Sequence, residues 1–171
     1  PSPKKWEIFR GDSFQLELTQ PEESFLIAMK IRCLLKAKSI DVRMAIGIGE
    51  KEHSAASILE SNGQAFVFSG EKFESLKKEK QTLAIKTPWP EFDGDMNLIL
   101  KLASIAMSKW TANSAEAIKI ALEKPDLIQE DLGKKLGIKQ NAVSGRLKRA
   151  YFDELTEVDA LFRKKIRTLV S

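Results

Sequence analysis

Cysteine and histidine are nearly absent from this sequence, which contains only Cys33 and His53 among its 171 residues. A single cysteine excludes a disulfide bond within the chain, and one Cys with one His cannot supply the ligands of a standard zinc site. The histidine stands in a polar stretch, where we expect it on the surface, and no motif supports a Ser-His-Asp hydrolase. These residues therefore predict no cofactor and no resident metal.

Long apolar runs are missing as well. No segment approaches the ~18 consecutive apolar residues that a membrane span needs, and no secretory signal opens the chain. The glycines are too few and too unfavourably spaced for a phosphate-binding loop. Because the lone thiol fits a reducing compartment, we expect a cytoplasmic protein without membrane contact.

What the sequence does have is a local excess of positive charge. The net formal charge is +4, and residues 124–150 hold seven basic and three acidic side chains. The difference of seven and three is four, so this short stretch accounts for the whole net charge. A basic patch on an otherwise balanced chain indicates a binding site for a polyanion.

The first 90 residues alternate strand and helix patterns. Apolar residues recur at every second position on both sides of Gly11-Asp12, which predicts a β-hairpin with its turn there. Helical periodicity begins at Pro21-Glu22-Glu23. The following segments are predicted as a buried strand, a loop or short helix, a helix and a short strand: residues 40–48, 53–61, 65–76 and 81–86.

The segment Thr87-Pro88-Trp89-Pro90 is the predicted domain boundary, because the pattern after it is entirely helical. We expect a helix capped by Asp93 or Asp95 and ending near Trp110. The apolar stripe on one face of this helix is made of four residues: Leu98, Leu102, Ile105 and Ala106.

Four further helical segments follow. One begins at Ser114 and ends before Pro125, and the next two form the helix-turn-helix described below. After Ala150 no two-stranded wing follows, because apolar residues recur every three to four positions from Tyr151 to Leu169. That last helix either packs within the chain or forms the seam of a homodimer.

A helix-turn-helix pattern occupies residues 127–150. Two short helices that cross at a tight turn need a small residue at their approach and a glycine in the turn. Gly133 and Gly137 stand at these two places. Asp126 is the expected cap of the first helix, and Ile138 is the apolar residue after the turn. Each helix also has a pair of apolar residues four positions apart, Leu132 with Leu136 and Val143 with Leu147.

The second of these helices carries the residues that we expect to contact double-stranded DNA. Amide side chains pair bidentately with adenine in the major groove, and basic side chains reach phosphates. Gly145 on the same face either permits close backbone approach or weakens the contacts. The predicted DNA-binding residues are Lys139, Gln140, Asn141, Ser144, Arg146, Lys148 and Arg149. Two alternatives stay open: an ordinary pair of amphipathic helices, and a helix-turn-helix that docks onto protein.

Four motifs resemble those of the SatD family of bacterial proteins. They are Arg10-Gly-Asp-Ser-Phe-Gln-Leu-Glu, Asp41-Val-Arg-Met-Ala-Ile-Gly-Ile-Gly-Glu, Ser61-Asn-Gly-Gln-Ala-Phe-Val-Phe-Ser-Gly-Glu and Gly137-Ile-Lys-Gln-Asn-Ala-Val-Ser-Gly-Arg-Leu-Lys. The resemblance covers nearly the whole chain and implies a regulator. Members of the family begin with a further β-strand that holds a Gly-Asp, so we expect residues upstream of Pro1.

More distantly, residues 9–76 are similar to class III nucleotide cyclases and GGDEF domains. That resemblance implies a ferredoxin-like palm in which Asp12 matches the metal carboxylate of the hairpin. Val67 and Glu71 stand where cyclases carry the Asn and Arg that stabilise the transferring phosphate, and a glutamate would repel it. Two-metal chemistry needs converging carboxylates, so one aspartate is insufficient. Asp12 is alternatively an ordinary residue of the hairpin turn. We expect Glu50 to be a solvated charge in a loop.

The sequence thus predicts an α+β protein of two domains. Residues 1–90 form a non-catalytic, cyclase-like ferredoxin-fold domain for dimerisation or sensing of a nucleotide, and residues 91–171 form an all-helical domain with the helix-turn-helix. The predicted function is transcription regulation by binding double-stranded DNA. The alternatives are a protein-interaction adaptor and a divergent nucleotide-processing enzyme.

Overall fold

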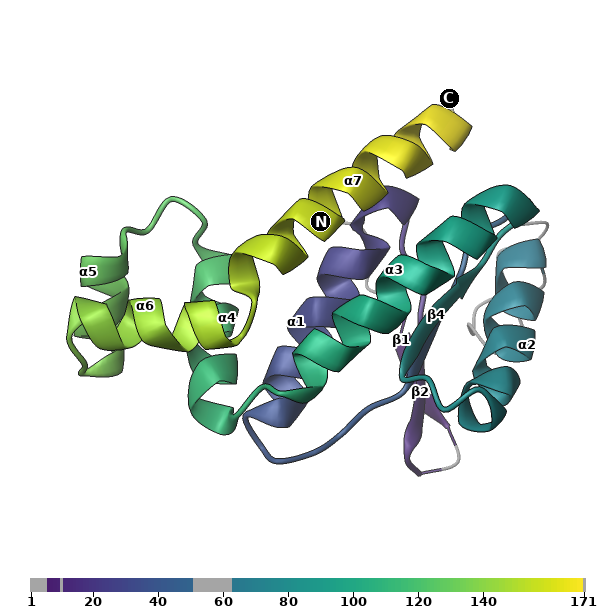
Figure 1. Cartoon of the computed structure of the whole chain (residues 1–171). Coiled ribbons are helices and arrows are strands. Elements are labelled where there is room, and N and C mark those ends of the chain that lie inside the picture. Colours follow the sequence, from purple (N-terminus) through teal and green to yellow (C-terminus); the bar gives the residue numbers. More distant parts are fainter. Residues whose placement is uncertain (1–5, 10, 51–62, 171) are drawn as a thin grey trace. The chain divides into compact units, whose positions relative to one another are not determined.

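The computed structural model describes residues 6–9, 11–50 and 63–170 and has an α+β fold that is mostly helical (Figure 1). His53 and the predicted segment 53–61 lie outside the described residues. The chain divides into two compact units, Pro1–Ser24 with Arg43–Leu100, and Phe25–Val42 with Lys101–Ser171. In the described part of the chain, no helix has both the length and the apolar character that crossing a membrane requires.

The elements follow the sequence in a simple order. The strands are β1 Trp6–Phe9, β2 Ser13–Leu16, β3 Met44–Gly47 and β4 Leu83–Lys86. A short 3-10 helix, Pro21–Glu23, leads into α1. The α-helices are α1 Ser24–Lys36, α2 Gln64–Lys78, α3 Pro90–Ser108, α4 Ala112–Glu123, α5 Gln129–Leu136, α6 Gln140–Arg149 and α7 Phe152–Val170.

The predicted β-hairpin is confirmed. Strands β1 and β2 pair antiparallel, with Trp6 opposite Leu16 and Phe9 opposite Ser13. Gly11 lies in the turn at φ 77°, in the left-handed region where a side chain is unfavourable. Asp12 beside it is exposed and accepts a hydrogen bond of 3.3 Å from the Ser13 hydroxyl.

The second sheet of the first unit, Pro1–Ser24 with Arg43–Leu100, pairs β3 and β4 in parallel, with Met44 opposite Leu83. The strand predicted over residues 40–48 is shorter at its start. The end of α1 continues into a turn in which Ser39 is left-handed at φ 59° and the Ile40 amide bonds back to the Leu35 carbonyl. Ile40 is therefore held at the end of α1, half exposed, rather than in the sheet.

Helix α2 lies against β3 and β4 at very close range (Figure 1). Gly47 makes this approach possible: a Cβ built on it would lie 2.0 Å from the Ala65 carbonyl oxygen and 2.6 Å from the Ser69 amide nitrogen. Backbone atoms of α2 thus occupy the space of a side chain at this position.

Helix α3 begins three residues earlier than the predicted cap at Asp93. Pro90 occupies its start, where a missing N–H costs nothing. The Asp93 carboxylate, inside the first turn, accepts bonds from the Thr87 amide (2.9 Å) and hydroxyl (2.8 Å). Asn97 then donates to the Ile85 carbonyl and accepts from the Ile85 amide, so that its side chain pairs with β4 as a neighbouring strand would.

Three of the four residues in the predicted apolar stripe of α3 are exposed, and Ala106 is half-buried. Leu98, Leu102 and Ile105 are 62%, 60% and 55% exposed. The buried positions of the helix lie on another face and are Phe92, Met96, Leu100, Ala103 and Met107. Both sets repeat every three to four residues, so the helical period alone did not distinguish the inner face from the outer one.

In the second unit, the continuous final helix predicted after Ala150 is confirmed as α7. Its inner face carries Leu155, Phe162 and Ile166, all buried. The Phe162 ring lies 6.0 Å from the ring of Phe25 on α1, a spacing typical of packed aromatic pairs. Thus α7 packs against α1 within the unit.

Cys33 on α1 is fully buried, and this burial raises the pKa of its thiol to about 12. We expect the thiol to stay protonated and unreactive toward the disulfide reagent DTNB at neutral pH, because only the thiolate attacks. The stability that depends on the protonated thiol is complete below the ordinary thiol pKa of about 8.5 and declines as the pH rises toward 12. Rapid DTNB labelling of the native chain would contradict this prediction; labelling in denaturant is the positive control.

Candidate nucleic-acid interface

The helix-turn-helix pattern folds as two short helices joined by a tight turn. Gly137 ends α5 in the left-handed conformation (φ 66°, ψ 29°) that the sequence predicted for it. A Cβ on Gly133 would lie 2.6 Å from the Ile138 carbonyl oxygen, so the chain after the turn passes directly over this glycine. Helices α4, α5 and α6 gather into one cluster (Figure 1).

The predicted cap at Asp126 is wrong. Ile128 holds the cap position of α5 and makes no side-chain cap bond. The chain turns once more before the helix, with the Leu127 amide bonded to the Lys124 carbonyl at 3.0 Å, and this turn leaves Asp126 exposed upstream. Acidic residues in the first turn, Glu130 and Asp131, favour the helix start through its dipole instead.

The inner face of α6 is buried as predicted. Val143 is fully buried and Leu147 nearly so. A contact that the sequence did not reveal holds the end of this helix: the Trp110 indole N–H donates to the Ala150 carbonyl at 2.9 Å, and both residues are buried. Trp110 is 40 residues from its acceptor, so only its position between two predicted helices could have signalled a role.

Five of the seven predicted DNA-binding residues lie along the exposed outer face of α6 and at its N-terminus. Asn141 and Lys148 are exposed on the side opposite Val143 and Leu147, and the exposed Ser144 flanks them. Gln140 is exposed at the N-terminus of the helix. Lys139, the residue at the cap position, is exposed beside it. The sequence of α6 contains no acidic residue, so no charge within the helix opposes an approaching phosphate.

The other two predicted residues, Arg146 and Arg149, are set apart from this group. Arg146 is half-buried and donates to the Asn113 carbonyl of α4 at 3.2 Å. Arg149 folds back along its own helix: one guanidinium nitrogen lies 3.1 Å from the place of a Cβ on Gly145. Gly145 therefore makes room for an arginine side chain, which explains a glycine on this face.

Lys134 on α5 contributes less to the basic patch than its charge suggests. It forms ion pairs with Asp131 at 2.8 Å and Glu130 at 3.2 Å. The hydrogen bond to Asp131 is the largest of the effects that raise the pKa of Lys134, followed by the bond to Glu130. Since its charge is matched locally, the uncompensated positive charge of residues 124–150 is concentrated on α6.

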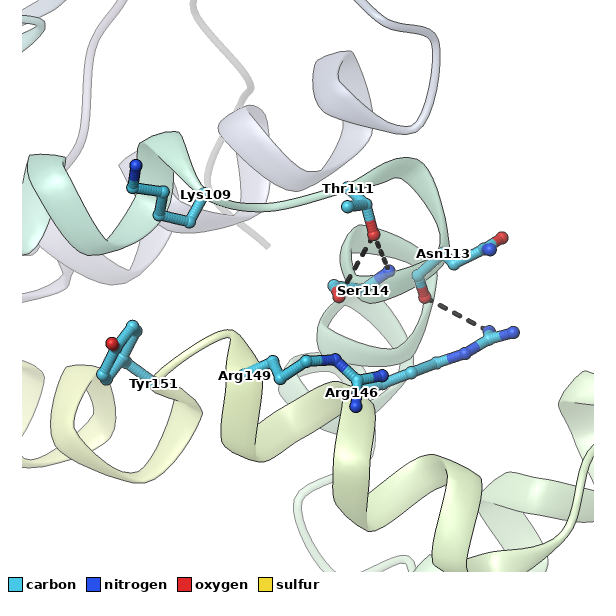
Figure 2. Close-up of a pocket in the computed structure, with 7 residues that line it drawn as sticks. All are labelled: Lys109, Thr111, Asn113, Ser114, Arg146, Arg149 and Tyr151. Carbon is cyan, nitrogen blue, oxygen red and sulfur yellow. Dashed lines mark hydrogen bonds between the residues drawn. The ribbon is translucent and has the colours of Figure 1, made fainter.

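The arginines line an open pocket of about 480 Å³ (Figure 2). Residues just after α3, at the start of α4, in the second half of α6 and at the α6–α7 junction surround it: Lys109, Thr111, Asn113, Ser114, Arg146, Arg149 and Tyr151. Thr111 caps α4 by accepting a bond from the Ser114 amide at 3.2 Å. Helix α4 therefore begins at Ala112, two residues before the predicted start at Ser114.

The candidate cyclase-like positions lie in the first unit. Val67 on α2 is 55% exposed, and Glu71 on the same helix is paired with Lys86 of β4. The ammonium of Lys86 also lies 5.1 Å from the ring centre of Phe68. Glu50 is exposed. Within the described residues, no cluster of three or more carboxylate, Cys or His side chains could hold a metal at Asp12 or elsewhere.

Comparison of the chain with protein-family models, with curated proteins and with solved structures found no match.

Proposed function

We propose that this protein is a regulator that binds double-stranded DNA through α6. The observation that carries the proposal is the composition of the exposed outer face of this helix. Amide, hydroxyl and ammonium groups lie together there, on a helix held from behind by a turn glycine and a buried apolar face. These are the groups that read base edges and neutralise phosphates in a major groove.

In this proposal α6 enters the major groove with its first turn foremost. The N-terminal residues of a recognition helix contact base edges, so Gln140 and Asn141 read adenine and Ser144 reads a neighbouring base. Lys139 and Lys148 neutralise phosphates on either side. The buried Val143 and Leu147 keep the other side of α6 on its own unit, which leaves the outer face for DNA.

The first unit serves dimerisation or nucleotide sensing without catalysis. The hairpin β1–β2 and the parallel pair β3–β4 are compatible with a ferredoxin-like palm. The four motifs quoted above favour a cytoplasmic member of the SatD family. Catalysis is disfavoured because Glu71 stands at a phosphate-stabilising position and is held there by Lys86.

A protein-interaction adaptor is the second candidate. The exposed apolar stripe of Leu98, Leu102 and Ile105 on α3 favours it, since contiguous apolar surface often marks a protein contact. The same stripe would serve a homodimer of the regulator. The two functions differ in one respect: an adaptor has no salt-dependent affinity for DNA.

We expect the full chain to bind a labelled mixed-sequence duplex in fluorescence anisotropy, with an affinity that falls steeply as salt rises. Lys148→Glu should weaken binding tenfold or more, because a charged hydrogen bond contributes about 1.5–3 kcal/mol. Lys164→Glu, an equal charge reversal at an exposed position of α7, is the matched control and should have a much smaller effect. Absence of binding at about 50 mM salt would disprove the regulator and favour the adaptor.

A further inference from the structure

The pocket beside α6 has the chemistry of an anion site. Three of its lining residues are cationic, Lys109, Arg146 and Arg149, and none of the seven described lining residues is acidic. Within the described part of the chain, no carboxylate forms an ion pair with either arginine. The Arg146 guanidinium donates to a neutral carbonyl, that of Asn113, and this bond leaves its charge uncompensated.

The start of α4 adds a second source of positive potential. The first amides of a helix have no acceptor within the helix, and the helix dipole is positive at this end. Thr111 satisfies one of them, the Ser114 amide. The first turn of α4, which is fully described, contains no acidic residue that would offset this potential. Backbone amides at a helix start together with guanidinium groups match the oxygens of a phosphate.

The two arginines line this pocket from a different helix, α6, and Arg146 reaches the first turn of α4. Figure 2 shows Arg146 extending to the Asn113 carbonyl, and Arg149 lines the same pocket as Ser114. Hydroxyl groups complete the lining: Thr111 at the cap of α4, Ser114 in its first turn, and Tyr151 at the α6–α7 junction. The pocket is thus surrounded by donors from both sides.

We propose that this pocket binds a phosphate group. The ligand is either a backbone phosphate of DNA lying against α6 or the phosphate of a free compound such as a nucleotide. In the first case the inference rests on the proposed function; in the second it stands without it. Arg149 provides the movable cation, and Arg146 with the α4 amides provides the fixed part of the site.

The first arm of the test uses inorganic pyrophosphate and the full chain in amide NMR, at constant ionic strength with chloride as the control anion. We expect saturable shifts at the amides of residues 111–114. Arg149→Gln should weaken pyrophosphate binding about tenfold, as the loss of one charged hydrogen bond implies. Lys109→Gln is a second variant that leaves α6 unchanged, and Lys164→Gln on α7 is the control. Shifts that do not saturate, or equal shifts in the control variant, would overturn the site.

The second arm separates the two sources of phosphate. If DNA supplies the group, Arg149→Gln lowers the slope of log affinity against log salt by about one and pyrophosphate competes with duplex. If a free compound supplies the phosphate, Arg149→Gln leaves the slope of log affinity against log salt unchanged. Nucleotides then shift the same amides as pyrophosphate does. Pyrophosphate binding without any DNA binding would refute the proposed function and support this inference. DNA binding without pyrophosphate shifts would support the proposed function and refute this inference.

Discussion

Gly47→Ala is expected to disrupt the first unit of the protein. The added methyl carbon would lie 2.0 Å from the Ala65 carbonyl oxygen and 2.6 Å from the Ser69 amide nitrogen. Both are backbone atoms of α2, so the whole helix would have to move away from β3. Overpacking of a core costs about 1–3 kcal/mol and sometimes more, and two close contacts with the backbone of one helix point to the upper end of this range. Thermal unfolding followed by circular dichroism should show a lower midpoint, by about 6–12 °C.

Gly70→Ala is the matched control, because Gly70 lies on α2 with no atom within 4 Å of its would-be Cβ. Replacement of a helical glycine by alanine gains about 0.5–1 kcal/mol, so this variant should unfold at a slightly higher temperature. Equal stability of the two variants would show that α2 does not approach β3 through Gly47.

Gly133→Ala is expected to disturb the helix-turn-helix and with it DNA binding. Its methyl carbon would lie 2.6 Å from the Ile138 carbonyl oxygen, in the segment that leads from the turn into α6. Relief of this clash requires α5 and the turn to separate. We expect a loss of about 1–3 kcal/mol in urea unfolding followed by tryptophan fluorescence, together with a loss of duplex affinity beyond that of any single charge substitution on α6.

Gly145→Ala serves as its control for stability. The nearest atom to that Cβ is the end of the flexible Arg149 side chain, at 3.1 Å, which can swing away. We therefore expect the usual helix gain of about 0.5–1 kcal/mol. If Gly133→Ala proved as stable as Gly145→Ala and kept its affinity for duplex, the close passage over Gly133 would not be what positions α6.

The features that the sequence predicted well are those with a local cause. The hairpin at Gly11, the helix start near Pro21 and the left-handed Gly137 each follow from the backbone preferences of a few neighbouring residues. The buried pair Val143 and Leu147 follows from helical spacing. The same spacing also predicts that the opposite face of α6 is exposed.

The features that escaped prediction have partners that are distant in the chain. The acceptor of the Trp110 indole is 40 residues away, and that of the Arg146 guanidinium is 33 residues away. The inner face of α3 depends on what packs against it, and two apolar stripes with the same period compete for that role. The cap at Asp126 failed because a turn at Lys124 shifts the helix start downstream.

The two long-range bonds that hold α6 in place share a property that bears on how this protein can diverge. Trp110 and Arg146 both donate to main-chain carbonyls, those of Ala150 and Asn113. Every residue type supplies a carbonyl, so a replacement of Asn113, which is exposed, keeps the acceptor. The donors have no such freedom, because few side chains carry an N–H at that reach. Variation among descendants of this sequence should accumulate at position 113 and spare Trp110 and Arg146.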